Sequence, residues 1–236
     1  MDSANQYMDQ VLFAILPYVA LATFFIGTIV RYRTRTFTYS SLSSQFLENQ
    51  QHFWSTVPFH YGILVVLFGH FVAFLIPRQI LWWNGQPARL FILEIAALIF
   101  GLMALFGMFS IFLRRITTPK VRVVTSPTDW MLYALLLVQI ASGIGVAIFY
   151  PWGSSWFSAA ATPYIWSILT LNPDISYIVG MPHLVKLHIV CASLLIGFFP
   201  FTRLVHVLVV PNPYLWRKPQ VVRWNWNPRT IRAPRS

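Results

Sequence analysis

Four histidines lie inside two strongly apolar segments of the chain. His60 and His70 stand ten positions apart in PFHYGILVVLFGHFVAFLIP (58–77), and His188 and His206 stand eighteen positions apart in a later segment. Polar groups at membrane depth are costly and tend to mark function. Neutral imidazole is a good iron ligand, and haem iron takes axial ligands from the helices around it. The spacing therefore indicates two bis-histidine haem sites.

Metal ions other than haem iron, and plain helix packing, fit these histidines less well. A zinc or copper site needs three or four converging ligands, and two separated pairs do not supply them. A lone histidine in a membrane often only bonds two helices together, which accounts less well for two pairs. Gly62 and Gly69 flank the first pair. They serve either close helix packing or the space that a flat macrocycle needs.

The composition indicates an integral membrane protein. Of 236 residues, 57% are hydrophobic and 10% are charged, against roughly 25% charged residues in soluble domains. The net charge of +11 alone would suggest a nucleic-acid binder, but the charges cluster between apolar runs and in the tail. The single Cys191 excludes an internal disulfide.

Five stretches approach or exceed the length of about 20 apolar residues that a membrane-spanning helix needs. We therefore predict an all-α membrane domain over 1–213, followed by a basic tail over 214–236. Pro200 is expected to kink the last helix because proline removes an amide donor. The predicted spans cover about 9–30, 54–77, 88–113, 128–149 and 183–210.

Lysine and arginine are distributed unevenly between the connecting segments. Three arginines follow the first span, four basic residues follow the third and six lie in the tail, whereas the other side holds only Arg78, Arg89 and Lys186. Basic residues gather on the cytoplasmic side of a membrane. The N-terminus is therefore expected outside and the C-terminus in the cytoplasm.

The opposite directions of spans two and five place the histidines at two depths. With a rise of about 1.5 Å per residue, His60 and His206 lie near the inner ends of their spans, and His70 and His188 near the outer ends. His60 is thus expected to pair with His206, and His70 with His188. Eighteen helical steps also return His206 to the face of His188, apart from a phase shift at Pro200.

Charged residues within the spans need partners. Arg203 lies one helical turn before His206. Its charge can be balanced by a haem propionate, or its side chain can extend to the polar inner surface of the membrane. Glu94 lies inside span three, either in a proton path or as a hydrogen-bonded structural acid, and Asp129 begins span four. The outer connection over 150–182 is expected to be an interfacial loop with tryptophan anchors, with a short surface helix as the alternative.

The histidine segments and the end of the chain resemble the gamma subunit of respiratory nitrate reductase, the membrane cytochrome b of that complex. The resemblance covers nearly the whole chain, and both histidine spacings match the family pattern. Its strongest carriers are PFHYGILVVLFGHFVAFLIP, LHIVCASLLIGFFPFTRLVH and VPNPYLWRKPQVVR.

The resemblance implies five helices around two b-type haems in the cell's inner membrane. It assigns His60 and His206 to the inner haem, and His70 and His188 to the outer haem. Quinol, either menaquinol or ubiquinol, would be oxidised near the outer haem. Electrons would then pass through both haems to an iron–sulfur subunit and a molybdenum-cofactor catalytic subunit on the cytoplasmic side, which reduces nitrate to nitrite.

One departure concerns the quinol site. Members of the family carry a lysine associated with quinol binding shortly after the proline that ends span two. The matching region here is NGQPARLFILE, with Leu90 near that place and Arg89 beside it. Arg89 is a candidate substitute, although arginine and lysine are not interchangeable. His183, at the outer edge of span five, is the second candidate quinol contact.

Two alternative functions remain open at this point. The cytochrome b subunit of a sulfite- or heterodisulfide-reduction complex would keep the haems and change the acceptor. A proton transporter with a histidine relay belongs to a different class, and it predicts more midplane polar residues and interrupted helices in matching halves. The basic tail is expected either to dock on the cytoplasmic subunits or to contact anionic lipids.

Overall fold

The computed structural model describes residues 3–40, 47 and 50–209. All regular secondary structure in this part of the chain is helical, and five helices are long and apolar enough to cross a membrane. The predicted all-α class and the five span-length helices are therefore confirmed, although the fifth ends at Phe201 and not near residue 210. The predicted tail over 214–236 lies outside the described residues. The spans are Asn5–Thr34, Phe53–Leu75, Pro87–Thr117, Pro127–Phe149 and His183–Phe201.

Prolines mark where several helices begin. A proline has no amide hydrogen to lose at the first helical position, and its fixed φ suits that place. In α7 the start is reinforced by a capping box, in which Ser126 Oγ accepts from Asp129 N and Asp129 Oδ2 accepts from Ser126 N. The helices that begin at proline are α4 (Pro77–Asn84), α5 (Pro87–Thr117), α6 (Pro119–Val123) and α7 (Pro127–Phe149).

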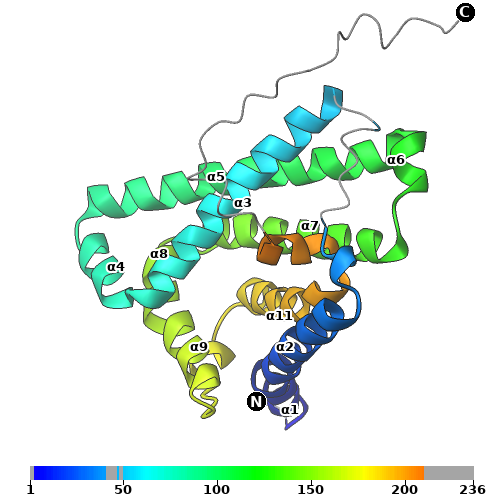
Figure 1. The fold of residues 1–236 in the computed structure, drawn as a ribbon. Coiled ribbons are helices and arrows are strands. Elements are labelled where there is room, and N and C mark those ends of the chain that lie inside the picture. Colours follow the sequence, from blue (N-terminus) through cyan, green and yellow to red (C-terminus); the bar gives the residue numbers. More distant parts are fainter. Residues whose placement is uncertain (1–2, 41–46, 48–49, 210–236) are drawn as a thin grey trace, which may run out of the picture.

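The spanning helices pack in a continuous series, which Figure 1 shows. α3 (Gln50–Leu75) packs on α5, α5 on α7, α7 on α11 (His183–Phe198), and α11 on α2 (Leu16–Thr34). Among the described residues, α3 and α11 do not form one of the closely packed helix pairs. The two histidine-bearing helices are therefore joined mainly through α5 and α7.

Glycine allows α3 and α5 to approach backbone to backbone. A Cβ atom at Gly62 would lie 2.5 Å from Ala104 N, and one at Gly107 would lie 2.3 Å from Phe59 N. Small residues serve this close approach in membrane helices. Of the two roles predicted for Gly62, helix packing is the one that this geometry supports.

The fifth span is broken at the predicted proline. The α-helix ends at Phe198, and a turn over Phe199–Phe201 leads into the 3₁₀ segment η5 (Arg203–Val209). Arg31 of α2 donates from Nη1 to the carbonyls of Pro200 and Thr202, at 2.7 and 2.8 Å. The kink is confirmed, but the expected common face of His188 and His206 is wrong, because no single α-helix joins them.

The outer connection is largely helical. It contains α8 (Gly153–Trp156), the short π-helix η3 (Phe157–Ala161), α9 (Thr162–Leu169) and α10 (Ser176–Val179). The expected plain loop is therefore wrong, and the alternative of short helices holds.

Two hydrogen-bonded contacts anchor this connection to the spans. Glu94 Oε1 accepts from Ser154 N and Oγ at 2.8 and 2.6 Å, as expected of a structural acid. The Tyr164 hydroxyl donates to Phe13 O at 2.7 Å. Burial raises the pKa of Tyr164, and the neighbouring Tyr18 raises it further, so this phenol remains a proton donor.

Candidate functional site

The structure brings the rings of His70 and His188 close together. Their ring centroids are 6.5 Å apart and the ring planes differ by 32°. A metal–imidazole bond is about 2 Å long, so two imidazoles on opposite sides of one metal have centres roughly 6 Å apart. Phe157 of the outer connection packs its ring against His70 at a centroid distance of 5.1 Å. The outer pair thus has the separation that a shared metal requires.

Three of the four histidines are held by the backbone of their own segment. Nδ1 of His60, His70 and His206 lies 2.8, 2.8 and 2.6 Å from a carbonyl oxygen three or four residues earlier. A carbonyl only accepts, so Nδ1 carries the proton. The unprotonated Nε2 is then the atom that can ligate a metal, and the hydrogen bond at Nδ1 orients the ring.

His188 is held by two side chains of α7. Its Nδ1 lies 3.1 Å from Ser142 Oγ, and its Nε2 lies 3.1 Å from Gln139 Nε2. The Ser142 hydroxyl donates to Gln139 O at 3.0 Å, so its oxygen accepts from Nδ1–H. The Gln139 amide nitrogen only donates, so Nε2 of His188 is unprotonated. All four histidines therefore share the tautomer that suits a ligand.

Gln139 and Ser142 are site residues that the sequence alone did not single out. A polar residue inside an apolar span is itself a signal, and a spacing of three residues places Gln139 and Ser142 on one helical face. What the sequence could not show is that this face of α7 lies against His188.

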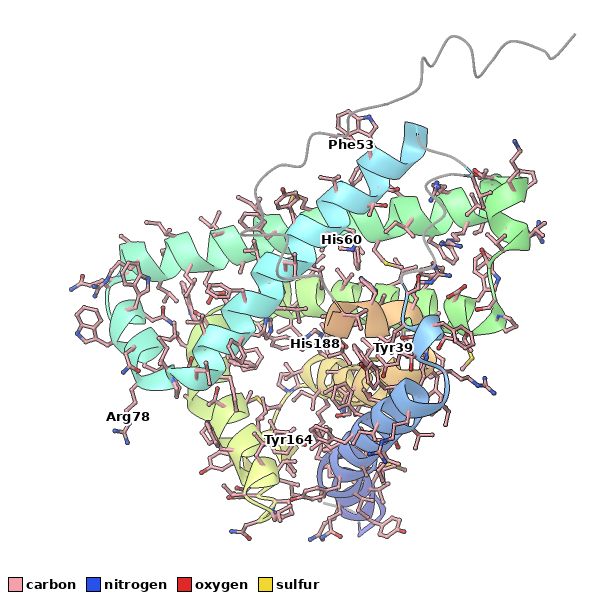
Figure 2. The ribbon with its side chains drawn as sticks, viewed as in Figure 1. Tyr39, Phe53, His60, Arg78, Tyr164 and His188 are labelled. Atoms are coloured by element: carbon pink, nitrogen blue, oxygen red, sulfur yellow. The ribbon has the colours of Figure 1, made fainter. Side chains whose placement is uncertain are left out.

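His60 and His206 occupy the other level of the candidate site. His60 lies on α3 and His206 in η5, and both are half-buried. Figure 2 shows His60 and His188 on different helices and well apart, consistent with their membership of different pairs. The pairing of His60 with His206 stays a prediction.

Arg203 is paired with Asp129. Arg203 Nε donates to Asp129 Oδ1 at 2.8 Å and Nη2 bonds Oδ2, while the two side chains are only 11% and 6% exposed. The charge is thus balanced by a carboxylate from the start of α7. Contact between Arg203 and a haem propionate stays a prediction.

The two candidate quinol residues lie in different settings. Arg89 stacks over the rings of Trp82 and Trp83, at 4.8 and 5.1 Å from their centroids, and its buried Nε has no partner among the described residues. His183 is exposed at the first position of α11. Both residues lie in the first turn of a spanning helix next to the outer connection, and their contact with quinol stays a prediction.

The residues present fit a haem at the outer level. His70 is exposed within an apolar span, its Nδ1 is held by Val66 O, and among the described residues no hydrogen-bond partner is found for its Nε2. A Cβ at Gly69 would meet no atom of the described residues within 4 Å, unlike one at Gly62, so the described part of the chain leaves space beside this glycine. Gln139 now covers Nε2 of His188 and leaves its own buried Oε1 without a partner in the described part of the chain. A metal at Nε2 would replace that amide, because both use the same lone pair.

Comparison with known proteins shows similarity over nearly the whole chain. The family model described as nitrate reductase gamma subunit matches residues 9–225. The respiratory nitrate reductase 2 gamma chain of Escherichia coli (strain K12) is 32% identical over 224 residues, covering 92% of this chain and 98% of that protein. The nitrate reductase gamma chain of Bacillus subtilis (strain 168) is 33% identical over 218 residues, covering 91% and 97%.

Proposed function

The chain belongs to the nitrate reductase gamma subunit family, and on that premise we propose that it is the dihaem cytochrome b subunit of a respiratory nitrate reductase. In this role it oxidises menaquinol or ubiquinol near the outer side of the inner membrane. The electrons leave on the cytoplasmic side toward an iron–sulfur subunit and a molybdenum-cofactor catalytic subunit. Its N-terminus lies outside and its C-terminus inside.

The observation that carries this proposal is the close pair His70 and His188. Their ring centroids lie 6.5 Å apart and their Nε2 atoms are unprotonated, so these two side chains from two different helices would be able to hold one haem iron. Intramembrane imidazoles without a bound partner would be costly. The proposed inner pair, His60 and His206, carries the same tautomer and adds the second level.

The protein's contribution is ligation, orientation and burial. When bound, the haems supply one-electron transfer between quinol and the iron–sulfur partner. His70 is oriented by its own helix and His188 by α7, so both Nε2 atoms are fixed before a metal is present. Arg89 and His183 are the proposed contacts of the quinol hydroxyls. The tail over 214–236 is proposed to dock on the cytoplasmic subunits.

Reduced-minus-oxidised absorption spectra of the purified complex test the proposal. We expect two low-spin b-type haems per chain. His70→Ala and His188→Ala should each remove the outer haem and quinol oxidation and leave the inner haem in place. His183→Ala is the matched control for haem binding, because it removes an exposed histidine from the same helix as His188. Loss of only the inner haem from either outer variant would show that the pairing is wrong.

The same preparation separates the alternatives. The family match favours nitrate over the acceptors of sulfite- and heterodisulfide-reduction complexes, and quinol-to-nitrate activity that disappears with this subunit tests that preference. A histidine-relay transporter would be correctly folded and colourless when haem is plentiful, and that result would overturn the proposal.

A further inference from the structure

His188 differs from the other three histidines in how its proton-bearing nitrogen is held. The other three donate to backbone carbonyls, which no side-chain substitution removes. His188 donates from Nδ1 to Ser142 Oγ on α7, at 3.1 Å. Ser142 is only 5% exposed, and its own proton is directed to Gln139 O, so the hydroxyl oxygen is free to accept. The orientation of this ring therefore depends on the neighbouring helix α7, through the Ser142 hydroxyl and a hydrogen bond to the backbone of Gln139.

The next residue of α7 provides the space for the ring. A Cβ on Gly143 would lie 2.9 Å from His188 Cε1 and 3.4 Å from its Nδ1. The first distance is too short for a carbon–carbon contact, so any larger residue would displace the imidazole. Ser142 thus supplies the acceptor, and Gly143 allows the ring to lie against the α7 backbone.

We propose that Ser142 and Gly143 are positioning residues that set the tautomer, orientation and donor strength of His188 as a ligand of the outer haem. The inference rests on the proposed dihaem function. A hydrogen bond from the remote ring nitrogen makes an imidazole a more basic ligand. Greater basicity favours the oxidised metal and lowers its midpoint potential, since hydrogen bonding around the ligands tunes haem potential. The outer site is thereby adjustable without any change at His60 or His206.

Substitution of Ser142 in the whole complex tests this inference. Ser142→Ala removes the acceptor, and Ser142→Thr keeps a hydroxyl. For Ser142→Ala we expect outer-haem retention to fall roughly 10- to 100-fold in transfer to apomyoglobin, and the outer midpoint potential to rise. The inner haem should not change, and Ser142→Thr should restore both values. The control is Ser193→Ala, which removes a buried serine of α11 that donates to Ile189 O at 3.1 Å.

Gly143→Ala provides an independent test, because the added methyl group displaces the ring while Ser142 is kept. It should also weaken binding of the outer haem and leave binding of the inner haem unchanged. If Ser142→Ala fails to assemble, Gly143→Ala and Ser142→Thr still test the inference. An unchanged outer haem in Ser142→Ala, equal changes in both haems, or no rescue by threonine would overturn the inference. If the wild-type complex holds two haems, such results refute this inference alone. A wild-type complex without haem would refute the proposed function as well.

Discussion

Replacing Asp129 with asparagine removes the carboxylate that neutralises Arg203. Asparagine keeps a side-chain oxygen that can accept from Ser126 N, so the capping box of α7 is retained. The substitution therefore changes the charge at this position and not the cap. Arg115, only 4% exposed and stacked over the ring of Tyr133 at 5.4 Å, adds a second buried cation nearby. The variant therefore leaves buried positive charge without its carboxylate.

The expected cost follows from the burial of the pair. Side-chain exposures of 11% and 6% place both partners almost out of solvent. Removing one partner of a buried ion pair lowers the free energy of unfolding by several kcal/mol. We expect a loss of about 3 kcal/mol, the lower end of the usual range, because asparagine keeps the shape and a hydrogen-bonding oxygen of aspartate. That loss corresponds to a roughly 100-fold change in the unfolding equilibrium constant. Because His206 Nδ1 donates to Arg203 O at 2.6 Å, the inner haem should be affected before the outer one.

Unfolding in mixed micelles with increasing SDS measures this cost, and haem spectra report which site is lost. A double-mutant cycle with Arg203→Gln isolates the pair, and we expect the double variant to be no less stable than Asp129→Asn alone. Asp174→Asn is the matched control, because it makes the same change at an exposed carboxylate in the outer connection. A loss below about 1 kcal/mol, typical of exposed pairs, or strictly additive effects would refute the reasoning.

Three further predictions follow from other contacts. Gly107→Ala should destabilise the bundle by about 1–3 kcal/mol, because the new Cβ would lie 2.3 Å from a backbone nitrogen of α3. In the same unfolding assay Gly101→Ala should be neutral, because its nearest contact would be at 3.5 Å. Lys186→Gln should lower the free energy of unfolding by about 2 kcal/mol, because it leaves the carboxylate of Asp9 without the ammonium group that Lys186 places at 3.0 and 3.1 Å. If adding Asp9→Asn does not restore stability, this reasoning is contradicted. Gln139→Leu should raise the affinity for the outer haem by up to roughly fivefold, since it removes the hydrogen bond of about 1 kcal/mol that competes for Nε2 of His188. A measured fall in affinity would contradict this and show that the Gln139 amide supports haem binding.

Local properties of the sequence were enough to predict the spans and the proximity of His70 and His188. Continuous apolar length specifies a membrane helix wherever it occurs, and proline acts within its own turn, as Pro200 does. Regular helical rise then places His70 and His188 at matching depth without knowledge of the packing. The structure adds that the centroids of their rings lie 6.5 Å apart.

The tertiary structure alone decided the contacts between helices. The sequence names Arg203 and Asp129 as charges in need of partners, but their pairing joins residues 74 positions apart. It gives no sign that Ser142 holds His188, because hydropathy does not show which face of α7 meets α11. It also assigns Gly62 and Gly69 the same alternative roles, whereas packing against α5 separates them. Each of these outcomes depends on rotation and crossing of whole helices, which only the summed packing of the bundle determines.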